Sequence, residues 1–208
     1  MKSKRFVALL LSLVMVFTLI GCGTQTPPDE TGDGQTGTHY KEEIVIAMAD
    51  EFTTIDPMET TAETNQIVQD CTHDLLTDTN LTTMENEGEL VDHWEMVAPD
   101  HWIFYLKDNV TFHDGTKLNV DDVEFTFERA KDHAATANYM AMIKEFVKVD
   151  ELTFEIYLTQ GNVDFNYTLA ANSLAILSKE AFETMPEEDA VKIGTGPWVF
   201  DEIGRAHV

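Results

Sequence analysis

The sequence is poor in cysteine and in basic residues. It contains 2 Cys, and its 13 Lys and Arg stand against 38 Asp and Glu, which gives a formal net charge of −25 at pH 7. Phosphate backbones need clustered cations, so this composition argues against nucleic acid as a partner. An acidic surface could attract cationic solutes such as basic peptides or metal ions, but a solvated acidic surface explains the charge more simply.

The usual sequence signs of catalysis and of metal binding are also missing. The 7 His residues include no H-E-x-x-H pair, and there is no G-x-S-x-G nucleophile motif and no phosphate-binding G-x-x-x-x-G-K-S/T loop. No internal repeat is present. We therefore expect no catalytic residue, no metal site and no cofactor. A surface hydrolase stays open as an alternative, because two carboxylates fixed in one cleft would leave no sequence motif.

The N-terminus resembles the signal peptide of a bacterial lipoprotein. Three basic residues at positions 2, 4 and 5 precede an apolar run, 6–20, that is short for a membrane span. The sequence Leu-Ile-Gly then leads directly to Cys22, as in a lipobox. We expect residues 1–21 to be cleaved and Cys22 to carry lipid, whose buried methylenes contribute about 0.8 kcal/mol each. A plain secretory signal or a single membrane anchor is the alternative.

The next segment, 22–39, is rich in Gly, Pro and Thr and has no apolar periodicity, which is typical of a flexible tether. The folded part is expected to span 40–208, a length that suits one domain. Because Cys22 would carry lipid, Cys71 has no partner for an intrachain disulfide. Its helical spacing with apolar neighbours in Asn65–Leu76 predicts a small buried hydrophobic side chain on a helix.

The most informative stretch covers residues 102–129. Trp102–Leu106 is an aromatic-rich run that predicts a buried strand, and a turn at Asp108-Asn109 would lead to a second short strand, Val110–Phe112. Asp114-Gly115 predicts another turn, since Gly adopts positive φ at no steric cost. Asn119 then offers a side-chain cap to a helix whose apolar positions lie on one face: Val120, Val123, Phe127 and Ala130.

Other segments predict further elements. A nearly continuous apolar run, Glu43–Ala49, predicts a strand buried on both faces, and a polar loop, Asp50–Pro57, follows it. Pro99-Asp100 predicts a turn between two strands, Trp94–Val97 and Trp102–Leu106. The remaining expected elements are a hairpin of Phe146–Val149 with Thr153–Leu158, and helices within Asp164–Ala171 and Ser178–Met185.

The pattern of residues 102–129 resembles the signature of the solute-binding proteins of peptide, dipeptide and nickel ABC importers. The matching residues are Trp102, Phe104, Leu106, Lys107, Val110, Phe112, His113, Asp114, Gly115, Asp122, Val123 and Phe125. A second segment, Gly194–Trp198, resembles the G-T-G-P-aromatic element of that family, and Trp198 is expected to be the apolar anchor of a following strand. Ile55-Asp56-Pro57 is similar to the L-D-P after the family's first strand, so the resemblance extends over 43–200.

This resemblance implies a mixed α/β fold of the periplasmic-binding-protein-like type. Residues 40–208 would form the first lobe of a two-lobe hinged structure, with the second lobe absent, because proteins of this family continue well beyond the equivalent of Val208. Such proteins capture their ligand non-covalently by hinged closure of the two lobes and perform no chemistry on it.

The function implied is that of a lipid-anchored extracytoplasmic component of an ABC importer, on the periplasmic side or at the cell surface. Its expected partners are an oligopeptide, the permease and ATPase subunits of the importer, and the membrane through the lipid. Nickel or a metallophore, or a glycan, are alternative ligands within the same role. An adhesive lipoprotein is an alternative from another class, although it would favour repeats.

Two segments are expected to contact the ligand, from their position in the resembled fold. The first is the loop after the expected first strand, because polar loops at such places commonly carry binding groups. The second precedes the short apolar run 174–177. The residues are Asp50, Glu51, Phe52, Thr53, Thr54, Asn172 and Ser173.

Overall fold

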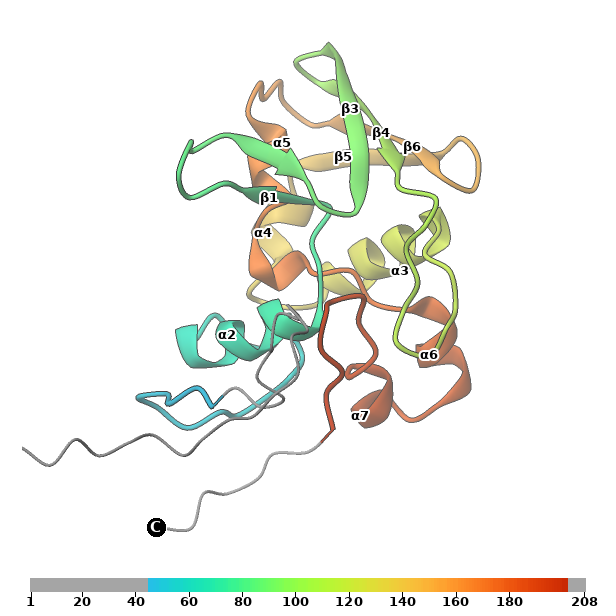
Figure 1. Ribbon diagram of the computed structural model, residues 1–208. Helices are drawn as coiled ribbons and strands as arrows, with labels where there is room; N and C mark the ends of the chain where they lie inside the picture. The colour runs from blue at the N-terminus through green and yellow to red at the C-terminus, as the bar shows by residue number, and fades with distance from the viewer. Residues whose placement is uncertain (1–44, 202–208) are drawn as a thin grey trace, which may run out of the picture. The chain divides into compact units, whose positions relative to one another are not determined.

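The computed structural model describes residues 45–201 (Figure 1). The chain divides into two compact units, Met1–Ile46 and Ala47–Val208, and nearly all described residues belong to the second. The expected signal peptide, Cys22, the tether and the first residues of the expected domain lie outside the described residues. No helix within 45–201 is long and apolar enough to cross a membrane.

The second unit mixes short helices with two antiparallel sheets. The helices are α2 (Glu63–Thr72), α3 (Val120–Ala130), α4 (Ala137–Met140), α5 (Phe165–Thr168), the 3-10 helix η1 (Asn172–Leu174), α6 (Lys179–Thr184) and α7 (Glu187–Ala190). The strands are β1 (Thr77–Thr79), β2 (Asn86–Gly88), β3 (Val91–Ala98), β4 (His101–Leu106), β5 (Ile143–Lys148) and β6 (Thr153–Leu158). The expected mixed α/β class is confirmed.

Four strands form the main sheet in the order β3-β4-β6-β5, so that β4 and β6 are central. Trp94 of β3 and Phe154 of β6 both lie opposite Phe104 of β4. The predicted strands at β4 and β6 are present, and alternate residues of each are buried: Trp102, Phe104, Leu106, Phe154, Ile156 and Leu158. The predicted turn at residues 99–100 and the predicted hairpin of β5 with β6 are both present.

The core lies between the buried face of this sheet and the helices. The ring of Phe104 stacks on Phe154 at 5.3 Å and meets Phe165 of α5 edge-on at 6.4 Å. Phe127 of α3 meets Phe146 of β5 edge-on at 5.9 Å. The pairs of Phe104 with Phe165 and of Phe146 with Phe127 join the sheet to α5 and α3, since large aromatic rings contribute much of the buried area of a core.

Helix α3 begins where the sequence predicts. The Asn119 side chain accepts a hydrogen bond from the Asp121 N–H at 2.7 Å, and Asp122 accepts one from the Asn119 N–H at 2.9 Å, which completes a capping box. The predicted apolar face is buried throughout: Val120, Val123, Phe127 and Ala130. Helix α6 starts in a similar way, with Ser178 accepting from the Ala181 N–H at 3.1 Å.

We predict that Asn119→Ala lowers the free energy of unfolding by about 1 kcal/mol, because the first turn of α3 loses its side-chain acceptor. Urea unfolding followed by far-UV circular dichroism would measure the change. Asn119→Ser, which keeps a capping oxygen, should cost clearly less. Equal stability of the alanine and wild-type chains would contradict the role of the cap.

Two predicted strands are wrong in the described residues. Val110–Phe112 forms a single bridge, Thr111 to Lys117, because β3 and β6 already occupy both edges of β4. Residues 45–49 form no strand, and Val45 is 83% exposed. Within 45–201 no strand pairs with them, so the ladder that a buried strand requires is missing.

Two predictions of burial are also wrong. Helix α2 buries polar residues, Thr64, Asn65, Gln69 and Thr72, whereas Ile67 is 38% exposed and Cys71 is only half-buried. Trp198 is 55% exposed, and no strand follows it within the described residues. The backbone attaches this segment instead, since the Trp198 N–H donates to the Cys71 carbonyl at 3.0 Å.

Candidate ligand-binding region

The loop before α2 is held by its own hydroxyls and by that helix. The Thr53 N–H donates to Asn65 Oδ1 at 2.9 Å, and Asn65 Nδ2 donates back to Thr53 Oγ1 at 2.8 Å. Thr54 Oγ1 donates to Glu59 at 3.2 Å and accepts from the Asp56 N–H at 3.1 Å. The loop therefore has a defined conformation although much of it faces solvent.

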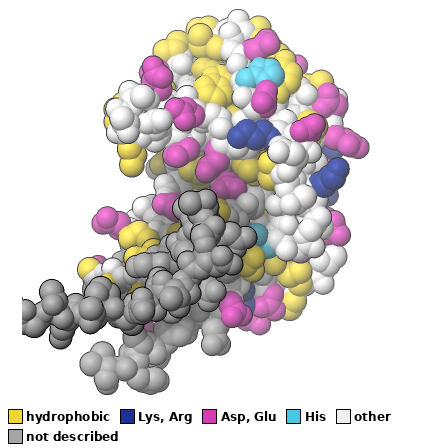
Figure 2. Space-filling view, viewed as in Figure 1, with side chains coloured by type: hydrophobic (Ala, Val, Ile, Leu, Met, Phe, Trp, Pro, Cys, Tyr) yellow, Lys and Arg dark blue, Asp and Glu magenta, His cyan; other side chains and the backbone are white. Residues whose placement is uncertain are grey.

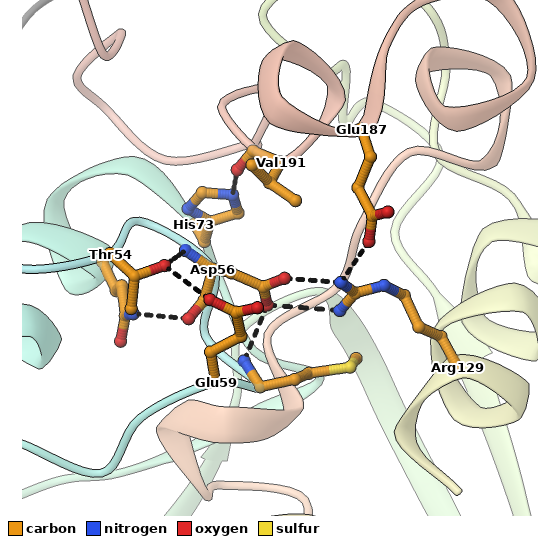
Figure 3. A network of polar contacts seen from close by, with 9 residues as sticks. Thr54, Asp56, Glu59, His73, Arg129, Glu187 and Val191 are labelled. Atoms are coloured by element: carbon orange, nitrogen blue, oxygen red, sulfur yellow. Dashed lines mark hydrogen bonds and ion pairs between the residues drawn. The ribbon is translucent and has the colours of Figure 1, made fainter. Parts of the chain in front are cut away.

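Asp56 fixes the far end of the loop. Its carboxylate is buried and receives two hydrogen bonds from Arg129 of α3, at 3.2 and 2.5 Å (Figure 3). It also accepts from the Met58 N–H at 2.9 Å, and the Asp56 carbonyl accepts from Gln69 Nε2 at 3.1 Å. A buried carboxylate needs this many partners, because an unpaired charge in the interior is costly.

The groups that the loop leaves free are polar. Asp50, Glu51 and Thr53 are exposed, whereas Phe52 is half-buried and stacks on Phe200 at 6.2 Å. Thr54 borders a hollow of about 570 Å³. The other residues around this hollow are Ile55, Asp56, Glu59, Pro186, Glu187, Glu188 and Val191. The loop can thus offer carboxylates and a hydroxyl to a ligand with donors.

The second predicted segment borders a different hollow, of about 340 Å³. The Asn172 amide lies there and donates to the Asp70 carboxylate of α2, whereas Ser173 is buried and does not line the hollow. The remaining residues around it are His73, Leu75, Asp78, Thr79, Leu81 and Glu89. The structure therefore does not bring the two predicted segments together in one hollow, although both contact α2.

Carboxylates line both hollows, and no Lys or Arg is among the lining residues. Residues 45–106 contain 14 Asp and Glu and no Lys or Arg. The face in Figure 2 shows many acidic side chains and few basic ones. The one-sided run between Lys41 and Lys107 was visible in the sequence and could have identified the carboxylates near Asn172. Such a surface favours the approach of cations.

Two groups at the smaller hollow have strongly shifted pKa values. Burial raises the pKa of the Glu89 carboxyl to about 7, although a hydrogen bond from the Leu75 N–H acts to lower it. The nearby carboxylates of Asp74, Asp78 and Asp70 raise it further. Burial lowers the pKa of His73 to about 4, so its ring is neutral at pH 7 and bonds the Val191 carbonyl at 3.1 Å.

These shifts give stability two opposite pH dependences. The pKa of Glu89 is 4.5 in an unfolded chain. Its contribution to the free energy of unfolding is therefore complete below pH 4.5 and is lost as the pH rises toward 7. The pKa of His73 is 6.5 when unfolded, so its contribution is complete above that pH and is lost as the pH falls toward 4.

We predict that Glu89→Gln stabilises the chain at alkaline pH. The free energy of unfolding of the variant minus that of wild type should be larger at about pH 8 than at about pH 5, by on the order of 1 kcal/mol after allowance for partial solvent exposure. Urea unfolding at both pH values would measure it. Glu85→Gln, a nearby exposed change, is the control. A Glu89→Gln chain with the same pH dependence as wild type would contradict the prediction.

The two family-like segments, 102–129 and Gly194–Trp198, contact each other at a joint formed by His113. His113 Nε2 donates to the Gly196 carbonyl at 2.8 Å, and His113 Nδ1 accepts from the Gly194 N–H at 3.3 Å. On the other side, the Gly196 N–H donates to the Thr72 carbonyl at 3.0 Å. Gly196 and Trp198 thus satisfy the Thr72 and Cys71 carbonyls at the end of α2, which have no partner within the helix.

The fold is shared with solute-binding proteins. Residues 85–207 match the family described as bacterial extracellular solute-binding proteins, family 5 middle. This match covers more than half of the chain, which therefore belongs to that family, and the predicted resemblance is confirmed. Proteins of the family act outside the cytoplasm.

The following relatives are longer than this chain. The HTH-type transcriptional regulator SgrR of Escherichia coli O6:K15:H31 is 33% identical over 123 residues, which are 59% of this chain and 21% of the regulator. DppA from Helicobacter pylori, solved with the peptide STSA, gives a TM-score of 0.65 at 24% identity. HbpA2 from Haemophilus parasuis gives 0.64 at 28% identity.

The structural matches cover most of this chain but a minority of each relative. They extend over 74% of this chain and 36% of DppA, and over 75% of this chain and 37% of HbpA2. The shared part agrees with a partial lobe of the solute-binding fold. The chain spans about a fifth of the length of the curated regulators that it matches.

Proposed function

We propose that this chain is the solute-capturing component of an ABC importer and that its ligand is an oligopeptide. In this role it binds the peptide non-covalently and delivers it to the membrane permease, while a separate ATPase supplies the energy. The observation that carries the proposal is membership of the family over 85–207 together with a rigidly held polar loop at 50–56.

A peptide suits the groups that this region offers. Its ammonium group and backbone N–H donors can bond the exposed carboxylates of Asp50 and Glu51 and the Thr53 hydroxyl. Asn172 lies at a separate hollow and would contact a ligand only if the ligand extends there. The peptide bound to DppA from Helicobacter pylori supports this ligand class. Because hinged closure takes two lobes, we expect these contacts alone to give weak binding.

The test is thermal unfolding of the chain without residues 1–21, alone and with defined ligands. The probes are tetraalanine, tetralysine, Ni²⁺ and a disaccharide. A ligand that binds only the folded form raises the midpoint, by about 2.7 kcal/mol of stability at a concentration 100 times its Kd. A rise with either peptide supports the proposal. A rise only with Ni²⁺ or with the sugar replaces the ligand, and no rise with any probe turns attention to a hydrolase or an adhesive protein.

We also propose that Cys22 carries lipid and holds the protein at the outer face of the cell membrane. The support is the Leu-Ile-Gly-Cys sequence after a short apolar run. Labelled palmitate should be incorporated into the wild-type chain in bacteria and not into a Cys22→Ala chain. Equal labelling of both chains would contradict lipidation at this position, and Cys71→Ala is the matched control.

A further inference from the structure

Helix α2 turns its polar side inward, and two of the buried residues reach the loop. Asn65 exchanges two hydrogen bonds with Thr53, and Gln69 donates to the Asp56 carbonyl. Asn65 and Gln69 are 1% and 2% exposed. Burying amides is unfavourable unless they are bonded. The Asn65 amide is bonded through both its atoms and the Gln69 amide through its nitrogen, whereas Gln69 Oε1 has no partner within the described residues.

Arg129 holds the other end of the same loop. Its side chain is 11% exposed and bonds both Asp56 carboxylate oxygens, and it donates to Glu187 of α7 at 2.8 Å. Its guanidinium also lies over the Phe182 ring at 5.3 Å. Figure 3 shows the guanidinium between Asp56 and Glu187. The donors of a guanidinium form a rigid fork. When several partners fix the guanidinium, a carboxylate that pairs with it through both oxygens is therefore held in one position.

The element that carries Arg129 is itself fixed. Helix α3 is capped at Asn119 and buries Val123 and Phe127 in the core. Arg129 therefore transmits the position of a rigid helix to a loop that is otherwise held by its own turns and by Asn65 and Gln69 of α2. Groups that must meet a ligand to within a fraction of an ångström are supported in this way by residues that do not touch it.

We propose that Arg129 is a positioning residue for the ligand loop, defined as Asp50–Asp56. Through Asp56, and together with Asn65 at the other end, it sets where Asp50, Glu51 and Thr53 present their polar groups. The proposal rests on the proposed function for its ligand. The loop-fixing part stands on the contacts of Arg129 alone.

A role limited to stability makes a different prediction from positioning. If Arg129 only stabilised the fold, its removal would speed hydrogen exchange throughout the chain to a similar degree. If it positions the loop, the change is local, because local openings are independent of global unfolding. The Thr53 and Met58 amides report on the loop, since their acceptors are the Asn65 and Asp56 side chains. The Phe104 and Ile156 amides report on the sheet.

The first experiment compares hydrogen exchange in the wild-type chain, Arg129→Lys and Arg129→Gln, well below their unfolding midpoints. We expect the Thr53 and Met58 amides to exchange about tenfold faster in Arg129→Gln and at an intermediate rate in Arg129→Lys, with the sheet amides unchanged. Lys131→Gln, which breaks the exposed pair with Glu128 on the same helix, should change neither set. Unchanged loop amides, or equal acceleration in loop and sheet, overturn the proposal.

The second experiment measures the affinity for tetraalanine by calorimetry. Arg129→Gln should bind about tenfold more weakly, the size that loss of a supporting partner commonly has at metal sites, and Arg129→Lys should recover part of the loss. Lys131→Gln, which breaks only the exposed pair with Glu128, should bind as wild type does. Wild-type affinity in Arg129→Gln overturns the proposal. A wild-type chain that binds no peptide overturns the proposed function, and the exchange experiment then decides the fixing of the loop.

Discussion

Gly196→Ala and Gly194→Ala are each expected to lower the free energy of unfolding by about 3 kcal/mol or more. A Cβ atom at position 194 would lie 2.0 Å from the Thr72 carbonyl oxygen and 2.9 Å from the His73 ring. At position 196 it would lie 2.6 Å from the Thr72 carbonyl carbon and 2.8 Å from the Cys71 carbonyl oxygen. These neighbours are mostly backbone at the end of α2, which cannot rotate away.

The clash would also break the joint between the two sequence motifs. If the Gly194–Pro197 loop moves off α2, His113 loses its partners at Gly194 and Gly196. Urea unfolding of the variants would measure the loss. Gly115→Asn is the matched control, because Gly115 has φ of +88° with no atom within 4 Å of a Cβ, and Asn tolerates this region. Alanine variants at 194 and 196 with wild-type stability would show that the loop does not pack on α2 as described.

Phe104→Ala is expected to lower the free energy of unfolding by about 3–5 kcal/mol. Phe104 is fully buried on the central strand β4, and its ring contacts Phe154, Phe165 and Trp102. Its removal takes away transfer free energy and leaves a cavity that strands paired on both sides cannot close. Domains of this size have a free energy of unfolding of about 5–15 kcal/mol, so the loss is a large fraction of the total and raises the unfolded population strongly.

The control for Phe104 is Trp198→Ala, which removes a larger side chain. Trp198 is 55% exposed, so we expect its loss to change stability by no more than about 0.5 kcal/mol. Thermal unfolding of both variants would compare them directly. A larger loss for Trp198→Ala than for Phe104→Ala would restore the sequence-based expectation that Trp198 is an apolar anchor.

Local pattern was enough to predict β4, β6 and α3. Their alternation, turn residues and cap are properties of neighbouring residues, and the structure follows them. The local pattern was not enough to predict which side of α2 is buried. A helix with an apolar and a polar side can bury either one, and here the loop that α2 contacts determines that the polar side is buried. The strand predicted from the apolar run 43–49 is absent in its described part, 45–49, for a related reason, since a strand needs a paired edge that its own sequence does not contain.

The candidate site was predictable only in part. The polar loop was predicted from its place after an apolar run and Asn172 from its place before one, and whether they contact a ligand stays a prediction. Arg129 was missed because it lies 73 residues from Asp56. The residues around a single Arg at the end of a helix give no sequence signal of such a distant partner. Glu89 was missed for a similar reason, although the absence of basic residues around it was a usable signal.

The strand order has a consequence for the path by which the chain folds. The hairpins β3–β4 and β5–β6 each join neighbouring residues, but β4 must also pair with β6, which is made only after α3, α4 and β5. Contacts between distant residues form late, because loop closure comes before any gain from pairing. During synthesis β4 therefore has an open edge that carries Trp102 and Phe104, the kind of edge on which chains aggregate. The acidic residues that precede β4 give nascent chains a common negative charge, which opposes their association at this stage.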